Sequence, residues 1–107
     1  MAKWAQDAGK KYGFDVDVLG LEDSKIEKLG AFLAVGKGSE NEPQFVIMNY
    51  TPKEKVASMK HIGLVGKGIT FDTGGLNIKT SGMVHMKCDM AGGAAVFGAM
   101  QLIADLQ

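Results

Sequence analysis

The stretch Val65-Gly-Lys-Gly-Ile-Thr-Phe-Asp-Thr-Gly-Gly-Leu-Asn-Ile-Lys79 lies in the glycine-rich half of the chain. Nine of the fifteen glycines fall between Gly63 and Gly98. Glycine is needed where φ must be positive, or where the main chain passes close to a ligand or to another strand. A short apolar run at residues 61–66 leads into this stretch. We therefore expect a strand that ends in a tightly folded loop.

The segments around this loop alternate between strand-like and helical patterns. Residues 14–18 alternate apolar and acidic side chains, which is the period of a strand with one buried face. The β-rich runs 45–50 and 61–66 are separated by about ten mostly polar residues that include a charged connector at 53–60, and such a short connection favours antiparallel pairing. We expect an α/β fold with a partial mixed β-sheet flanked by helices. The expected helices cover residues 3–12, 21–29 and 91–106, and residues 31–35 form a short apolar run.

The composition excludes several classes of protein. The 107 residues include 12 basic side chains, all of them lysine, and 12 acidic ones, so the formal net charge is zero. Without a basic cluster, the chain is expected to bind neither nucleic acid nor an anionic membrane surface. The single cysteine, Cys88, cannot form a disulfide within the chain, and residues 1–12 lack the apolar core of a signal peptide. We therefore expect one soluble domain, residues 1–107, in the cytoplasm.

The side chains that can carry chemistry lie in the glycine-rich stretch and just after it. Lys67 and Asp72 are held between glycines at the end of an apolar run, and Lys79 and Asp89 follow. Two carboxylates and two amines that converge on a cleft could hold a divalent cation, because carboxylate oxygens suit hard or borderline metals. A lysine can join them only as the neutral amine, and burial or a nearby dication lowers a lysine pKa.

Each of these residues also has an ordinary structural interpretation. Lys67 and Lys79 fit solvated surface lysines, and Asp72 before Thr-Gly-Gly fits a turn aspartate. Residues 83–90 alternate as a strand does, so Asp89 fits either the polar face of that strand or the N-terminal charge of the next helix. The residues alone leave the metal site and the structural interpretation both open.

Three other kinds of site fit the residues less well. His85 and Cys88 have His-x-x-Cys spacing, but the chain has no further cysteine with which to build a zinc site. Gly66-Lys67 is followed by glycine, where a phosphate-binding Walker loop needs serine or threonine. A Schiff-base enzyme that acts through Lys67 or Lys79 is the remaining alternative.

Residues 65–79, together with residues 86–98, closely resemble the leucyl aminopeptidase (cytosol aminopeptidase) family. The catalytic domain of that family carries V-G-K-G-[IL]-T-F-D-[ST]-G-G-x-x-[IL]-K, followed by M-K-x-D-M-x-G-A-A-x-V. The resemblance continues upstream through residues 28–39 and 43–47, so it covers nearly the whole chain. It implies that this chain is the first part of an aminopeptidase catalytic domain.

The resemblance also implies a role for each of the four residues in a two-metal site. Lys67 matches the lysine whose neutral amine ligates one ion, and Asp72 matches the aspartate that contacts both ions. Asp89 matches a further ligand of the lysine-bearing ion, which also receives the α-amine of the substrate. Lys79 matches the catalytic lysine that polarises the scissile carbonyl. The ions in this family are zinc, manganese or magnesium, and they generate the nucleophile from water.

Family members are several times longer than this chain. They have a separate N-terminal domain and a downstream Asn-Thr-Asp-Ala-Glu-Gly-Arg segment, which supplies two more metal ligands and an arginine that holds a bicarbonate. The 107 residues contain neither that segment nor any arginine. Two hypotheses follow: the chain represents a leucyl aminopeptidase that acts on peptides, or it is a non-catalytic folded fragment that binds one divalent ion weakly. The family assembles as homohexamers, whereas we expect this chain to self-associate in a different order.

Overall fold

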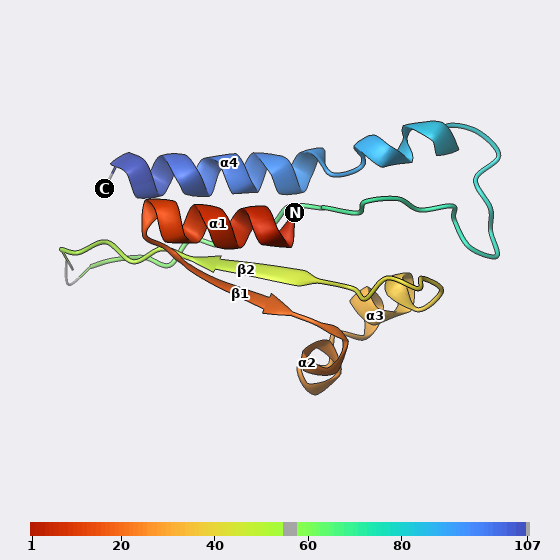
Figure 1. The fold of residues 1–107 in the computed structure, drawn as a ribbon, viewed down its shortest axis with the longest axis horizontal. Helices are drawn as coiled ribbons and strands as arrows, with labels where there is room; N and C mark the ends of the chain where they lie inside the picture. The colour runs from red at the N-terminus through yellow and green to blue at the C-terminus, as the bar shows by residue number, and fades with distance from the viewer. Residues whose placement is uncertain (55–57, 107) are drawn as a thin grey trace. The chain divides into compact units, whose positions relative to one another are not determined.

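The computed structural model describes residues 1–54 and 58–106. The chain forms two compact units, Met1–Tyr50 and Thr51–Gln107. The first unit contains a two-stranded sheet with three helices, and the second contains an extended irregular segment followed by helices (Figure 1). Among the described residues, none of the helices has the length and apolar character that a membrane span requires. The charged connector expected at 53–60 falls partly on residues 55–57, which lie outside the described residues.

Helix α1, Ala2–Tyr12, opens the first unit. It ends at Gly13, whose φ of 77° is left-handed and whose N–H donates to the Gly9 carbonyl at 2.8 Å. The helix expected here, with Gly13 as its stop, is confirmed. A β-carbon at Gly9 would lie 2.6 Å from the Phe14 carbonyl oxygen and 2.7 Å from Val16 Cγ2. Glycine therefore lets α1 pack closely against the strand that follows it.

Strands β1, Asp15–Leu19, and β2, Phe45–Asn49, form an antiparallel two-stranded sheet. Asp15 lies opposite Asn49 and Leu19 lies opposite Phe45, so the two strands pair along their full lengths. Both strands match the expected bounds within one residue at each end. In the described residues, the expected mixed sheet is represented by this antiparallel pair alone.

The strand partner expected for β2 is wrong. β2 pairs with β1, and residues 61–66 form no strand ladder in the part of the chain that the structure describes. An apolar run forms a strand only when a neighbouring strand satisfies its backbone N–H and C=O groups. Residues 61–66 have no such neighbour among the described residues, and Val65 is 98% exposed.

The helix expected at residues 21–29 begins at Leu21 as expected, but its expected end is wrong. Helix α2, Leu21–Ile26, stops before Lys28, which adopts a left-handed φ of 57°. Helix α3, Gly30–Gly36, then begins and contains the apolar run at 31–35. The left-handed residue is a lysine rather than glycine or asparagine, so the usual composition signal for a helix end is absent there.

Side chains of the connection between β1 and β2 pack against the elements around it. Phe32 of α3 packs edge-on against Phe45 of β2, with ring centroids 5.5 Å apart. Glu42 Oε1 accepts the N–H of Leu21 at 2.8 Å and so caps the start of α2. Ser24 of α2 is fully buried, and its hydroxyl has no hydrogen-bond partner among the described residues. The polar turn before β2 therefore stabilises a helix that begins much earlier in the chain.

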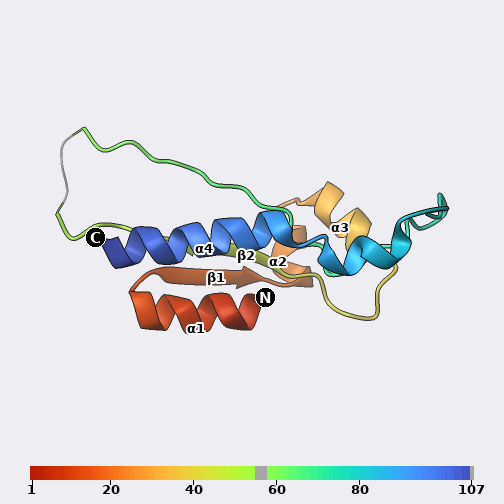
Figure 2. The ribbon, with the colours of Figure 1, turned by 90° about the horizontal axis from the view of Figure 1, so that it is seen from above.

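The second unit ends in a short 3-10 helix, η1, Met83–Cys88, and a long helix, α4, Ala91–Leu106 (Figure 2). The bounds of α4 confirm the helix expected at 91–106. Of the two structural interpretations of Asp89, the strand over 83–90 is wrong, because this segment satisfies its backbone groups locally. The His85 N–H donates to the Gly82 carbonyl at 3.0 Å, and the Asp89 N–H donates to the Met86 carbonyl at 3.1 Å. Such i to i+3 bonds define a 3-10 helix.

Candidate functional site

The loop between Asp72 and Lys79 folds back and brings its two ends together. Lys79 Nζ donates to Asp72 Oδ2 at 2.9 Å, and the Lys79 N–H donates to the Thr73 carbonyl at 2.9 Å. Gly74 makes the fold possible, because its φ is 92° and its N–H donates to Asp72 Oδ1 at 2.6 Å. A β-carbon at Gly74 would lie 3.0 Å from the Lys79 nitrogen. The glycine thus fixes a lysine beside a carboxylate.

Lys67 and Asp89 form a second ion pair, with Lys67 Nζ 2.7 Å from Asp89 Oδ2. The lysine side chain is 59% exposed and the aspartate side chain is 26% exposed. Asp89 lies between η1 and α4, at the point where one helix gives way to the next. The Lys67 carbonyl accepts the N–H of Gly93, in the first turn of α4, at 2.6 Å. The start of α4 therefore contacts the lysine segment, and it follows the aspartate partner directly in the chain.

The two ion pairs act on each other electrostatically. The hydrogen bond to Asp89 raises the pKa of the Lys67 ammonium, and the charge of Asp72 raises it further. The hydrogen bond from Lys79 lowers the pKa of the Asp72 carboxyl, as does the Gly74 N–H, and the charge of Lys67 adds to this effect. The four side chains singled out from the sequence are therefore electrostatic neighbours in the second unit.

The donor atoms of this cluster fit part of a divalent-metal site. Asp72 and Asp89 offer carboxylate oxygens, and Lys67 offers a nitrogen once its proton has left. Among residues 1–54 and 58–106, no three His, Cys, Asp or Glu side chains gather into a group that could hold a metal ion. A set of three protein ligands here therefore needs the lysine. An ion that binds this set must displace the Lys67 proton, and the neighbouring carboxylates oppose that displacement because they raise the Lys67 pKa.

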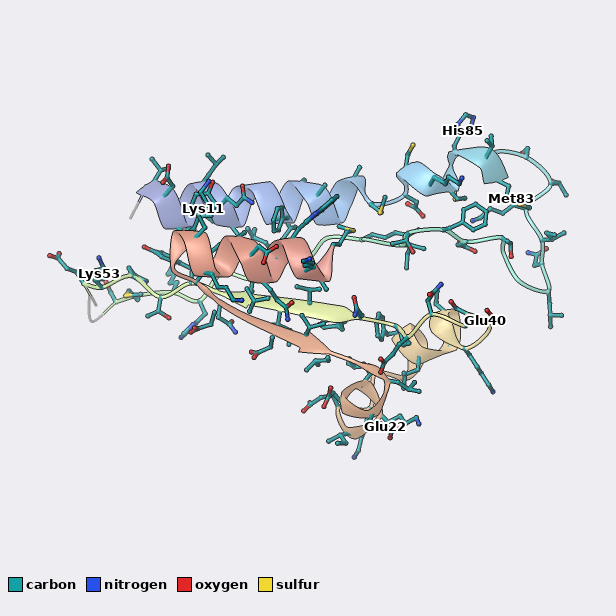
Figure 3. The ribbon with its side chains drawn as sticks, viewed as in Figure 1. Lys11, Glu22, Glu40, Lys53, Met83 and His85 are labelled. Atoms are coloured by element: carbon teal, nitrogen blue, oxygen red, sulfur yellow. The ribbon has the colours of Figure 1, made fainter. Side chains whose placement is uncertain are left out.

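The alternative His-x-x-Cys site gains no third ligand. His85 projects outward from η1, and Cys88 is an exposed free thiol (Figure 3). Neither belongs to a metal-binding group within the described part of the chain.

Sequence reasoning missed the contact between the Lys67 segment and the glycines at residues 92 and 93. Two consecutive glycines in the first turn of a helix are unfavourable for the helix itself. Their presence is the signal that another backbone approaches closely at that point.

The catalytic-domain model of the cytosol aminopeptidase family matches residues 1–107. The chain belongs to the cytosol aminopeptidase family. The match confirms the resemblance drawn from residues 65–79 and 86–98. Members of this family use divalent metals.

Relatives in this family are similar to the chain along its whole length. A protein of Chlorobium limicola named "Probable cytosol aminopeptidase" is 47% identical over 103 residues, which are 95% of this chain and 20% of that protein. Its namesake in Bacillus subtilis is 46% identical over 110 residues, covering 100% of this chain and 21% of that protein. The solved apo structure of leucyl aminopeptidase from Trypanosoma cruzi matches with a TM-score of 0.88 at 40% identity, over 99% of this chain and 20% of that one. The chain thus spans about a fifth of the length of these relatives.

Proposed function

We propose that this chain carries part of the dinuclear metal centre of a leucyl aminopeptidase, an enzyme that removes N-terminal residues from peptides. The observation that supports this most directly is that the second unit holds the two ion pairs Lys67–Asp89 and Asp72–Lys79, in a chain of this family. Lys67 and Asp89 would ligate one ion, and Asp72 would contact both ions. Each of these three residues supplies a donor atom that divalent metals accept.

Lys79 would act on the peptide substrate rather than on the metals. A fixed ammonium beside the scissile carbonyl stabilises the negative charge that develops on its oxygen during attack. The bond from the Lys79 ammonium to Asp72 and the bond from the Lys79 backbone N–H to the Thr73 carbonyl fix the position of Lys79 in the loop. Bound Zn²⁺, Mn²⁺ or Mg²⁺ would supply the activated water and a site for the substrate α-amine.

The second candidate function is binding of one divalent ion without catalysis. It is favoured by the number of metal ligands. The second unit offers Lys67, Asp72 and Asp89 to one ion, but it offers only the shared Asp72 to the other. The chain also has no arginine, which the family's bicarbonate site would need. We propose that the 107-residue chain on its own follows this second candidate, while the aminopeptidase activity belongs to the whole enzyme.

An activity assay separates the two candidates. We expect the purified 107-residue chain to hydrolyse no leucine-p-nitroanilide, even with added Mn²⁺ or Zn²⁺, because the donor set for the second ion is incomplete. Reproducible turnover that disappears in Lys79→Ala would instead show that this chain is a competent catalyst. Turnover that survives in Lys79→Ala would point to a contaminating peptidase.

A calorimetric titration tests the metal site itself. We expect Zn²⁺ to bind the unmutated chain at one site, and we expect Asp72→Ala to abolish that binding because it removes a ligand. Asp105→Ala is the matched control, since Asp105 is an exposed aspartate of α4 in the same unit. A flat titration of the unmutated chain would rule out the metal-binding role for this chain.

The partners and location follow from the proposed enzyme. Peptides would be the substrates, and we propose neither a nucleic-acid nor a membrane partner. The cytoplasm is the proposed location, in keeping with the name cytosol aminopeptidase carried by the relatives. The homohexamer of the family is proposed for the whole enzyme only.

A further inference from the structure

Two glycines that are distant in sequence bring the Lys67 segment against the first turn of α4. A β-carbon at Gly66 would overlap the carbonyl oxygen of Gly92, and it would lie 2.7 Å from the carbonyl carbon of Gly92 and 2.8 Å from Val96 Cγ2. A β-carbon at Gly92 would lie 3.1 Å from the Lys67 nitrogen and 3.4 Å from its carbonyl oxygen. The first overlap is with backbone, which cannot rotate away as a side chain can. This approach of two main chains therefore requires glycine at Gly66.

Lys67 is also bound to α4 through its main chain. The first N–H groups of a helix have no acceptor within the helix. One of them, the N–H of Gly93, donates to the Lys67 carbonyl at 2.6 Å, while the next, from Ala94, donates to the Met90 carbonyl at 2.8 Å. The Lys67 backbone thus caps α4, and the Lys67 side chain pairs with Asp89 just before the same helix.

We propose that Gly66 and Gly92 are positioning residues, whose close contact sets Lys67 Nζ and the Asp89 carboxylate at the spacing needed to ligate one divalent ion. This inference rests on the proposed metal-binding function. Gly66 lies one residue before Lys67, and Gly92 lies three residues after Asp89. A wider contact between the two glycines would therefore move the two ligands relative to each other. Neither glycine touches the ion; each acts through the ligand beside it.

The experiment compares glycine-to-alanine variants with controls on the same two segments. Gly66→Ala and Gly92→Ala widen the contact. Gly63→Ala and Gly98→Ala are the controls, because a β-carbon at either position meets nothing within 4 Å. Gly98 lies in α4 as Gly92 does, so both of those variants raise helix propensity and differ only in the contact.

Two readouts are taken without metal and one with it. Amide hydrogen exchange of Gly93 reports its bond to the Lys67 carbonyl, and the through-hydrogen-bond scalar coupling between Lys67 Nζ and the Asp89 carboxyl carbon reports the ion pair. Calorimetric titration with Zn²⁺ then gives the affinity of each variant. Far-UV circular dichroism confirms that α4 is intact in each variant, and Gly92→Ala serves as the milder substitution if Gly66→Ala does not fold.

We expect Gly66→Ala and Gly92→Ala to lose Gly93 protection and the Lys67–Asp89 coupling, and to bind Zn²⁺ about 10- to 100-fold more weakly, which is the range found when groups that orient metal ligands are replaced. The two control variants should keep all three properties of the unmutated chain. A purely structural role for the glycines would lower thermal stability but leave the Lys67–Asp89 coupling intact at low temperature.

The metal-free readouts keep this inference separate from the proposed function. If Gly66→Ala and Gly92→Ala fold and retain the coupling, the positioning role is overturned, whatever the Zn²⁺ titration gives. If the unmutated chain shows the coupling but binds no Zn²⁺, the metal-binding function fails, and loss of coupling in the two variants still supports the control of ligand spacing. Equal loss of coupling in Gly98→Ala would overturn the proposal, because that substitution leaves the contact unchanged.

Discussion

At the scale of single residues, a glycine positions the charged side chains Asp72 and Lys79 in the second unit. Asp72 and Lys79 are seven residues apart, and they meet because Gly74 adopts a left-handed φ and gives its N–H to the aspartate. A carboxylate that accepts both a lysine and a backbone donor keeps its charge, which is why its pKa is lowered. The same arrangement holds the lysine ammonium at a fixed point.

Gly74 and Gly75 should therefore differ in their tolerance of alanine. Gly75 has a φ of 66°, and a β-carbon added there would meet nothing within 4 Å, so Gly75→Ala should cost about 1 kcal/mol of unfolding free energy. Gly74→Ala should cost about 2–3 kcal/mol, because its β-carbon also overlaps the Asn77 carbonyl. Urea unfolding of both variants measures the difference. Equal losses would show that the loop relaxes around the new methyl group.

Ser24 offers a second comparison at this scale. Its buried hydroxyl has no hydrogen-bond partner among the described residues, so Ser24→Ala should leave the unfolding free energy unchanged or raise it by up to about 1 kcal/mol. Ser39→Ala is the control, because the Ser39 hydroxyl accepts the Asn41 N–H at 3.0 Å and its loss should be mildly destabilising. Urea denaturation followed by circular dichroism measures both. A clear loss of stability in Ser24→Ala would mean that its hydroxyl has a partner.

At the scale of elements, helix ends are controlled by residues outside the helix. The Glu42 carboxylate, from the turn before β2, accepts an N–H from the first turn of α2, and the Lys67 carbonyl accepts one from the first turn of α4. Both acceptors satisfy N–H groups that a helix cannot satisfy itself. In each case a helix start is therefore joined to a segment far away in the sequence.

Removal of the Glu42 cap should weaken α2. Glu42→Ala should cost about 1 kcal/mol of unfolding free energy, because Leu21 loses its acceptor and the helix N-terminus loses a negative charge. Glu42→Gln retains an acceptor oxygen and should recover part of that loss. Glu40→Ala, at a nearby exposed position, is the control and should be neutral. Thermal and urea unfolding measure all three, and a neutral Glu42→Ala would show that water replaces the cap.

The elements also show what the sequence can and cannot predict. α1 and α4 are predictable because their apolar residues recur with helical spacing and because Gly13 stops α1. The strand at 61–66 is mispredicted because an apolar run does not reveal whether a partner strand is present. The end of α2 is missed because Lys28 is left-handed without being glycine. Residues 83–90 mislead because alternation over a few residues also fits a 3-10 helix.

The candidate site, too, is only partly predictable from the sequence. Lys67, Asp72, Lys79 and Asp89 can be singled out from the motif, and the Asp72–Lys79 pair follows from a loop within that motif. The partner of Lys67 depends on where α4 lies, and the Gly66–Gly92 contact holds the start of α4 against the Lys67 segment. The consecutive glycines of α4 signal that a backbone approaches there, but they do not tell which segment it belongs to. Long-range approach of two backbones is decided by tertiary structure.

At the scale of the whole molecule, the chain leaves much apolar surface uncovered. The exposed apolar side chains of the second unit include Val65, Leu76, Val84, Leu102 and Leu106. Exposed apolar area of this extent favours association between molecules. The first unit adds two open strand edges, since its sheet has only β1 and β2 among the described residues.

We therefore expect the isolated chain to self-associate. Its mass from light scattering should exceed that of a monomer and should increase with concentration. The double variant Leu102→Lys, Leu106→Lys should lower that mass, because it removes two exposed leucines from α4. Asp105→Lys changes the charge of the same helix without removing apolar surface and serves as the control. A monomeric mass at every concentration would contradict this prediction.

From the connection between β1 and β2 we expect an order of folding within the first unit. The strands are neighbours in the sheet, yet residues 20–44 separate them in the chain. Single helices relax within about a microsecond, whereas strands that close a long connection must lose its conformational entropy before their hydrogen bonds form. α1 therefore has time to form and dissolve repeatedly before the sheet closes. We therefore expect the connection, rather than the strands, to determine how long the folding chain exposes its unpaired β1 edge.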